Sequence, residues 1–247
     1  MIQGTRKLSA GKFNVRGGEL VSLNGASASF VSPLPAGETD EIAVTIEPSP
    51  DRSPKPSATV VLRGKPRANT ARLRFPVALK QIGGSFILAT PTSEETEDET
   101  AGVWFLRMAN GMKPSLRLSR LPAAGWVWEG WGVTQKTPLT TGRFTSASGA
   151  DRSSPFSGPK PGPPFPGEDF LRRLPGGLSM PADLADGSSM VVLTIEPDLR
   201  GTDPTGPAPF SIKPLIAKIS AGAADHTSIR LQRDLSGVPT GAVRFEM

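Results

Sequence analysis

Alternation of apolar and polar residues is the dominant pattern along this chain, and it predicts β-strands. Trp126 and Trp128 lie two positions apart, so an extended strand places both side chains on one face. Gly130 interrupts the alternation and puts Trp131 out of phase, which indicates a bulge or a bend. A second short strand, residues 140–145, follows after a Lys-Thr-Pro turn. This stretch therefore predicts a β-hairpin.

The tryptophans of the chain allow two interpretations. Large aromatic side chains dominate the energetics of protein cores, so the first interpretation is a packed core. The second is a surface on which a carbohydrate or peptide ligand stacks. The residues to which both apply are Trp104, Trp126, Trp128 and Trp131.

The remaining elements are short. Residues 84–90 and 102–107 are typical of paired strands, with the acidic run 94–99 as an exposed connection. The 27 Gly and 26 Pro argue against long helices. One short helix is expected near 167–174, because acidic residues begin that stretch, basic residues end it and Pro-Gly-Gly follows. We expect an all-β, antiparallel β-sandwich.

Two segments of the chain occur in similar form twice. Residues 41–49, EIAVTIEPS, resemble residues 190–198, MVVLTIEPD, and both lead into a Pro-rich loop and a further strand. Residues 9–13, SAGKF, resemble residues 140–144, TTGRF. These two pairs of similar segments predict two related β units.

The expected units are residues 1–82, a partial unit, and residues 83–247, a unit with a Pro-rich insert at 154–170. The first unit lacks a counterpart of the tryptophan strand. Either residues ahead of it are missing, or a later segment supplies that strand. The C-terminal segments 227–233 and 241–247 are the candidates for the second alternative.

Charge and the Pro-rich insert indicate possible contact surfaces. The net charge is +5, and a basic stretch without acidic residues alternates with Leu73 and Phe75, which is typical of the wet face of a strand and also suits an acidic partner. The insert is expected to be stiff and extended, and to dock on a partner or on its own unit. The candidate partner-binding residues are Arg63, Lys65, Arg67, Arg72, Arg74, Lys160 and Phe165.

Catalytic chemistry finds little support in the sequence. There is no cysteine, and the single histidine, His226, lies in a polar stretch. Ser157 and Lys160 have the spacing of a serine–lysine pair, but the Gly-Pro between them disfavours the helical turn that this chemistry needs. The acidic run 94–99 is closer to a solvated loop than to a calcium loop. We expect no enzyme, no cofactor and no metal site.

Nucleic acid and membrane insertion are also disfavoured. The basic stretch has no accompanying nucleic-acid-binding motif. No apolar run approaches the roughly 20 residues needed to span a bilayer. The N-terminal stretch MIQGTRKLSAGKF has no apolar core of a signal peptide.

Five motifs carry a resemblance to a known family. LPAAGWVWEGWGV, TTGRF, PFPGEDFL, MVVLTIEPD and APFSIKPL resemble the bacterial anti-sigma-factor-like proteins related to the C-terminal domain of anti-sigma-K factors. The resemblance covers residues 83–219 well and residues 1–80 faintly. It implies a β-sandwich outside the cytoplasm. Trp128 stands where the family usually has Tyr, and the sequence shows neither a zinc-binding sigma-capturing domain nor a membrane anchor, so sigma-factor inhibition is not implied.

The functional expectation is therefore protein–protein binding. We expect a non-catalytic, extrinsic structural or scaffold subunit on the periplasmic face of a membrane, bound to integral-membrane subunits and not spanning the bilayer. A photosynthetic reaction centre with its antenna is one assembly that such a subunit would suit. The alternative is an extracytoplasmic sensor or regulatory domain of an anti-sigma system.

Overall fold

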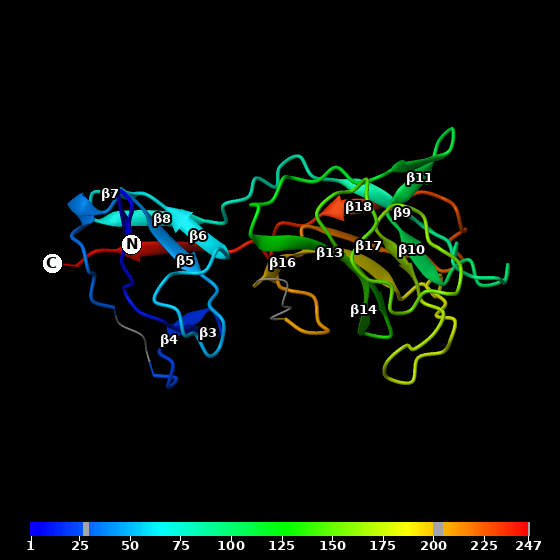
Figure 1. The fold of residues 1–247 in the computed structure, drawn as a ribbon, viewed down its shortest axis with the longest axis horizontal. Helices are drawn as coiled ribbons and strands as arrows, with labels where there is room; N and C mark the ends of the chain where they lie inside the picture. Colours follow the sequence, from blue (N-terminus) through cyan, green and yellow to red (C-terminus); the bar gives the residue numbers. More distant parts are fainter. Residues whose placement is uncertain (27–29, 200–204, 247) are drawn as a thin grey trace. The chain divides into compact units, whose positions relative to one another are not determined.

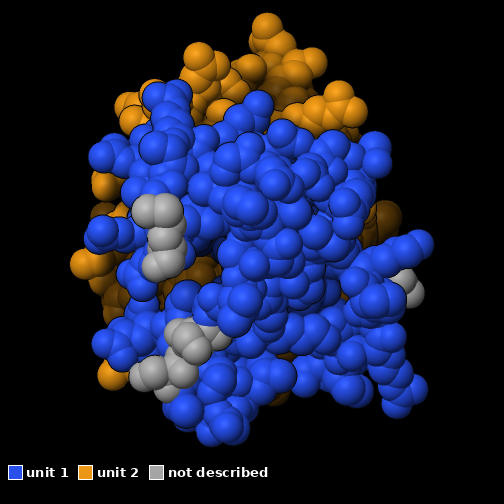
Figure 2. Space-filling view, turned by 90° about the vertical axis from the view of Figure 1, so that its left-hand side faces the viewer, with its two compact units in different colours: residues 1–76, 239–247 blue, residues 77–238 orange. Residues whose placement is uncertain are grey.

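Two compact units make up the chain. The computed structural model describes residues 1–26, 30–199 and 205–246. Residues 1–76 together with 239–247 form unit 1, and residues 77–238 form unit 2 (Figures 1 and 2). Both units consist of antiparallel strands, and among the described residues the helical structure is one 3-10 turn, η1 (Ala36–Glu38). The prediction of an all-β, antiparallel fold is confirmed.

Unit 1 is built around one small antiparallel sheet. The sheet has the order β19-β8-β6-β5, with β7 paired to β8, and two separate hairpins, β1–β2 and β3–β4, accompany it. Its strands are β1 (Ile2–Gln3), β2 (Arg6–Lys7), β3 (Asn14–Arg16), β4 (Glu19–Val21), β5 (Ile42–Thr45), β6 (Val60–Gly64), β7 (Pro66–Arg67), β8 (Thr70–Arg74) and β19 (Thr240–Arg244).

The core of unit 1 is small. On β8, buried Ala71 and Leu73 alternate with exposed Arg72 and Arg74, as the apolar and polar pattern of that strand predicts. Ala71 and Leu73 pack with Ile42 of β5, and partly buried apolar residues surround them. One face of the sheet therefore meets the core and the other carries charge.

Unit 2 contains a larger antiparallel sheet that nearly closes on itself. Its path is β14-β13-β16-β17-β18-β9-β10-β15, and the two end strands, β14 and β15, approach each other as in a barrel (Figure 1). A separate hairpin, β11–β12, accompanies it. The strands are β9 (Gly84–Leu88), β10 (Gly102–Trp104), β11 (Leu106–Met108), β12 (Met112–Pro114), β13 (Gly125–Thr134), β14 (Thr137–Phe144), β15 (Gly167–Asp169), β16 (Met190–Asp198), β17 (Leu215–Lys218) and β18 (Ile229–Arg233).

The predicted hairpin and its irregularity are confirmed in β13 and β14. The two strands pair antiparallel, and their register shifts between Glu129 and Trp131, at Gly130. A side chain at Gly130 would overlap the ring of Phe105 and the hydroxyl of Thr141, so glycine lets the strand approach its neighbours closely there. The predicted pairing of 84–90 with 102–107 is confirmed as well, because β9 pairs with β10.

The helix predicted near 167–174 is wrong. Gly167, Glu168 and Asp169 form β15, which pairs with β10 from Gly102↔Asp169 to Trp104↔Gly167. The distribution of charges along this stretch suits a helix, but both acidic side chains are buried and bonded to distant residues. Tertiary contacts therefore determine the local conformation, which charge patterning cannot reveal.

The C-terminal segments belong to different units. β18 pairs with β9 and β17 in unit 2, whereas β19 pairs with β8 in unit 1. In the sheet of unit 1, β19 lies at the edge opposite β5. The expected unit 83–247 thus differs from the observed division, in which residues 239–247 belong to unit 1. Neither C-terminal strand lies beside β5.

The hairpins that lie beside the two Thr-Ile-Glu-Pro segments share their geometry. In β1–β2 the pairs are Ile2↔Lys7 and Gln3↔Arg6, and in β13–β14 the last pairs are Val133↔Pro138 and Thr134↔Thr137. Each hairpin then meets the start of a Thr-Ile-Glu-Pro strand. Ile2 forms an antiparallel bridge with Glu41, and Val133 pairs with Met190.

The loops after the two Thr-Ile-Glu-Pro segments also share their hydrogen bonds. The Glu47 carboxylate accepts a bond from the backbone N of Ser57 at 3.1 Å, and the Glu196 carboxylate accepts one from Phe210 at 2.8 Å. The isoleucine before each glutamate also donates its N–H to a backbone carbonyl: Ile46 to Thr59, and Ile195 to Ile212. In both copies the accepting residue lies two positions after the residue that binds the glutamate. The same sequence thus closes a Pro-rich loop in the same way twice.

Candidate binding surfaces

The candidate basic residues of unit 1 gather on one sheet face. Arg72 and Arg74 project from β8, and Arg63 of β6 lies directly opposite Arg74 in the register. Like charges placed opposite each other on neighbouring strands repel. Arg63 is balanced by Glu41, whose carboxylate accepts from Nε at 2.7 Å and from Nη2 at 2.6 Å, and this hydrogen bond raises the Arg63 pKa.

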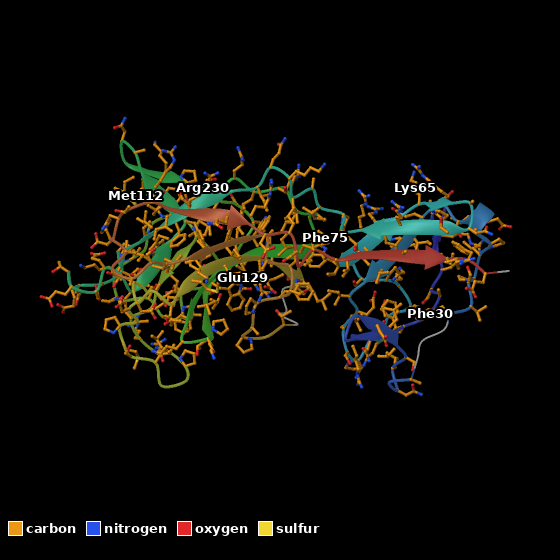
Figure 3. The ribbon with its side chains drawn as sticks, turned by 180° about the vertical axis from the view of Figure 1, so that it is seen from behind. Phe30, Lys65, Phe75, Met112, Glu129 and Arg230 are labelled. Atoms are coloured by element: carbon orange, nitrogen blue, oxygen red, sulfur yellow. The ribbon has the colours of Figure 1, made fainter. Side chains whose placement is uncertain are left out.

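The other two candidate cations lie beside this group. Lys65 and Arg67 are exposed around β7, and Lys65 projects outward from unit 1 in Figure 3. We call Arg63, Lys65, Arg67, Arg72 and Arg74 the basic face. Unit 1 has twelve Lys and Arg but seven Asp and Glu, so the whole net charge of +5 belongs to unit 1, and unit 2 is neutral.

The four tryptophans form part of the interior of unit 2. Their exposed fractions are 2–3%. Trp131 donates from Nε1 to the Thr194 hydroxyl at 2.9 Å, and Trp128 donates to the Ser119 carbonyl at 3.3 Å. A stacking surface needs an accessible ring face, which these side chains do not offer. The arrangement is that of a packed core.

Asp169 anchors the Pro-rich insert to unit 2. Its carboxylate accepts bonds from Trp104 Nε1 at 2.6 Å and from the backbone N of Thr92 at 2.7 Å. Thr92 in turn accepts from the backbone of Gly158 through its hydroxyl and from Lys160 through its carbonyl. The insert is therefore fastened to its own unit at several points.

The two candidate residues of the insert have different surroundings. Phe165 is 9% exposed and packs with Trp104 and Leu106 in an apolar cluster of unit 2. Its ring is therefore occupied within the unit. Lys160 is exposed, and its charge is accessible. The basic face and Lys160 belong to separate units.

Unit 2 contains several buried carboxylates, whose burial sequence reasoning did not foresee. Glu129 accepts from Arg143 Nε at 2.8 Å and from the Thr140 hydroxyl at 2.6 Å. Burial raises the pKa of Glu129, while the bond from Thr140 and the charge of Arg143 oppose that rise. Burial likewise raises the pKa of Glu196 and Asp169. Alternation in a strand cannot mark these acids as buried when both strand faces are covered.

Two more carboxylates lie where β14 approaches β15. Asp151 accepts from the backbone N of Gly167 at 3.0 Å, and burial raises its pKa to about 6. Glu168 accepts from the Ser157 hydroxyl, and its second oxygen has no hydrogen-bond partner among the described residues. Burial raises the pKa of Glu168 to about 8, and the charges of Asp151 and Asp169 act in the same direction.

Most of these carboxylates are engaged in hydrogen bonds. Each of the other buried acids is bound to backbone or side-chain donors, and within residues 1–26, 30–199 and 205–246 no group of three His, Asp or Glu side chains could hold a metal ion. Ser157 is occupied by Glu168 and lies in an irregular loop, so the serine–lysine helical turn is not formed. In the acidic run, Asp98 accepts bonds from the Thr90 and Ser93 hydroxyls.

One apolar hollow lies on unit 2 beside the tryptophan strand. It has a volume of about 320 Å³. Trp131 and Glu129 contribute to its lining, together with Phe156 and three prolines. Because Trp131 is 2% exposed and Glu129 is held by Arg143, the lining offers few free polar groups to orient a ligand.

The comparisons with known proteins add no family. No protein-family model, no curated protein and no solved structure matches this chain. Among the described residues, no helix has the length and apolarity to cross a membrane.

Proposed function

We propose that the protein acts by binding another protein, as a non-catalytic extrinsic subunit or scaffold of a membrane complex outside the cytoplasm. The observation that carries the proposal is the concentration of the net charge of +5 in unit 1, with five cations on its basic face. An acidic surface on an integral-membrane subunit is the complementary partner. Electrostatic complementarity of this kind raises association rates and selects partners.

The layout of unit 1 supports this proposal. Arg72 and Arg74 cannot be neutralised by strand neighbours, since the residues paired with them are Ala242 and Thr240. Arg74 also lies directly opposite Arg63 on the neighbouring strand β6. The repulsion within this group would fall if an acidic partner covered it. Unit 2 offers no comparable excess of one charge.

We further infer that the two units are related copies of one β unit. The matching hairpin registers and the matching closures of the Pro-rich loops support the inference. On this basis the predicted sandwich corresponds in unit 2 to the opposite walls of the barrel-like sheet.

Capture from source membranes tests the proposed function. The tagged protein should retain an integral-membrane protein in stoichiometric amount, and Arg72→Glu/Arg74→Glu should reduce that recovery at least about tenfold, because opposed charges become like charges. The control Lys213→Glu/Lys218→Glu makes the same charge change at exposed sites of unit 2 and should retain the partner. Recovery of the chain alone, or equal losses for both variants, would contradict the proposal.

A sensor or regulatory domain of an anti-sigma system is the second candidate. Three of the motifs that resemble that family form adjacent strands, β14, β13 and β16, and a fourth leads into β17. The resemblance therefore concerns one continuous region of the sheet. Genetic deletion tests this candidate: a change in the transcripts of one sigma factor's targets is expected, and unchanged transcripts would exclude it.

A further inference from the structure

Unit 2 has no net charge, but its cations and its acids are separated along the chain. Residues 77–92, 100–128 and 226–234 contain seven Lys and Arg and a single acid, Asp234. The structure brings these three stretches together around β9, because β11 packs against it and β18 pairs with it. A unit that is neutral as a whole therefore has one strongly basic part.

Hydrogen bonds and strand pairing fix the positions of these cations. Arg117 donates from Nε to the Gln81 carbonyl at 2.7 Å, Arg233 donates to the Lys80 carbonyl, and Arg230 lies on β18 beside β9. All are exposed, and among the residues that the structure describes none of them forms a salt bridge. We call the following six exposed residues the cationic surface: Lys80, Arg107, Lys113, Arg117, Arg230 and Arg233.

The hairpin β11–β12 adds apolar side chains to the cationic surface. Arg107 pairs with Lys113 on one face of the hairpin, and Met108 pairs with Met112 on the other. Leu106 shares the methionine face and is buried in the core, whereas Met108 is 56% and Met112 46% exposed. The apolar face of the hairpin thus continues beyond the core and ends in solvent.

The two methionines flank the turn of this hairpin, which contains Asn110 and Gly111. The cations Arg107 and Lys113 each lie one residue, about 3.3 Å, further from the turn. In Figure 3, Met112 and Arg230 lie on the same side of unit 2, away from Glu129. An apolar tip with cations directly behind it fits a bilayer interface, where apolar side chains reach the acyl chains and cations stay among the headgroups.

Charge and apolarity together favour a lipid surface over other acidic partners. A polyanion such as RNA is bound through its charge, and the exposed methionines would add little to that contact. A bilayer with anionic headgroups uses both the cations and the apolar tip. The six cations also fall within the range of roughly four to eight that is typical of sites for anionic lipid.

We propose that the cationic surface and the tip of β11–β12 bind the surface of an anionic bilayer, with Met108 and Met112 inserted at the boundary between headgroups and acyl chains. The inference goes beyond the proposed function, because the ligand is lipid and the surface belongs to unit 2. The basic face that is proposed to bind protein belongs to unit 1, so each surface is tested without the other.

Flotation of the whole protein with vesicles tests this inference. Vesicles of equal parts phosphatidylglycerol and phosphatidylcholine should carry the protein, and raised salt should release much of it because exposed charges are screened. Vesicles of phosphatidylcholine alone should bind it at least about tenfold more weakly. Absence of binding, or equal binding to both kinds of vesicle, would overturn the inference.

Removal of the apolar tip separates insertion from simple charge attraction. Met108→Ser/Met112→Ser should weaken binding to the anionic vesicles roughly tenfold, because the hairpin loses the side chains that enter the bilayer. The matched control is Val15→Ser/Leu20→Ser, which changes an exposed pair on the β3–β4 hairpin of unit 1 and should bind normally. Equal losses for the two variants would contradict the proposed surface.

Charge reversal tests the cations of the same hairpin. Arg107→Glu/Lys113→Glu should weaken vesicle binding at least about tenfold. Lys65→Glu/Arg67→Glu makes the same charge change on the basic face of unit 1 and should retain most of the binding. If both variants lose binding equally, the net charge of the protein, and not this surface, determines its affinity for the vesicles. Tryptophan fluorescence checks that unit 2 remains folded in each variant.

A fluorescent label on the hairpin reports insertion directly. The chain contains no cysteine, so Ala109→Cys allows an environment-sensitive dye to be attached at the turn alone. Its emission should shift to the blue on anionic vesicles, whereas a dye at Thr96→Cys, in the acidic run, should not respond. Vesicle binding without a shift at position 109 would overturn the inference. So would RNA binding that exceeds vesicle binding, which would assign the surface to a polyanion.

The proposed protein-binding function fails by a different result. It fails if capture from source membranes does not depend on Arg72 and Arg74. The vesicles contain no protein, so their binding measures the lipid surface of unit 2 alone.

Discussion

The two Thr-Ile-Glu-Pro strands show how one sequence pattern behaves in two surroundings. β16 lies in the middle of a sheet, between β13 and β17, and its residues are buried on both faces. β5 has the same sequence pattern, and its loop is closed by the equivalent carboxylate, Glu47, but it lies at the edge of its sheet. The difference comes from the neighbouring strand and not from the strand itself. Matched substitutions at corresponding positions measure what that neighbour contributes.

The largest difference is expected at the aromatic pair Phe144 and Phe13. Phe144 is 2% exposed, so Phe144→Ala should destabilise unit 2 by about 4 kcal/mol through lost burial and a cavity. Phe13 is half-buried, and Phe13→Ala should cost about 1 kcal/mol. Because all four tryptophans lie in unit 2, fluorescence follows its unfolding in urea. Hydrogen exchange of β8 reports on unit 1, and equal losses would refute the comparison.

The next largest effect is expected at Arg143 and Lys12, the cations that follow the glycine in the similar segments TTGRF and SAGKF. Arg143→Ala leaves the buried carboxylate of Glu129 without its cation and should cost about 3 kcal/mol. Lys12→Ala removes a pair whose cation is exposed, so it should cost less than Arg143→Ala. The double variant Glu129→Gln/Arg143→Ala should recover part of the loss in urea unfolding. If it recovers none, the carboxylate is not the source of the cost.

The response to pH should differ between the units. The pKa of Glu168 is raised to about 8 in the folded protein. The stability that this group contributes is therefore fully present below the usual pKa of 4.5, and it is lost as pH rises from that value towards 8. Between pH 6 and 8, unit 2 should lose roughly 2 kcal/mol of unfolding free energy through this group. Glu168→Gln should remove that dependence, whereas Glu94→Gln, at an exposed site, should not.

Acid should affect unit 1 in the opposite sense. The bond from Lys12 lowers the pKa of Asp51, so the stability it contributes is present above the usual pKa of 3.8 and is lost as pH falls below that value. Urea unfolding followed by exchange at β8 should therefore show a decline in acid that Asp51→Asn abolishes. A decline of the same size in that variant would show that other groups are responsible.

The smallest difference is expected at Gly142 and Gly11, the glycines of the similar segments TTGRF and SAGKF. Gly142 has φ +94°, and a side chain there would overlap the Asp151 carboxylate, so Gly142→Ala should cost about 2 kcal/mol. Gly11 has φ +135°, but a side chain would meet only the exposed ring of Phe30, so Gly11→Ala should cost about 1 kcal/mol. Gly149→Ala, in open space, is the control in thermal unfolding and should have little effect.

The sequence predicted elements whose pattern is local. The hairpin and the bulge at Gly130 follow from alternation and from one glycine, and both are confirmed. The predicted helix failed because Glu168 and Asp169 are held by Ser157, Trp104 and Thr92, which are distant or unmarked in sequence. Local charge order had no information about these partners.

The candidate surfaces likewise include features that follow from local sequence pattern and features that depend on distant contacts. Exposure of Arg72 and Arg74 follows from their alternation with Ala71 and Leu73. The burial of Phe165 could not be inferred, because a Pro-rich segment has no periodicity that shows which side packs. The position of β5 at the edge of its sheet could not be inferred either. Identifying it required the pairing of β19 with β8, a contact between residues far apart in the chain.

The interrupted course of unit 1 has a consequence for synthesis of the protein. β8 ends at Arg74, and its neighbour β19 begins only at Thr240, after the whole of unit 2 has been translated. At the usual speed of a ribosome, that interval lasts roughly 10 to 30 s. During this time β8 presents an unpaired edge on the nascent chain. The arginines at positions 72 and 74 then act as gatekeepers, because charged side chains on an edge strand discourage other chains from pairing with it.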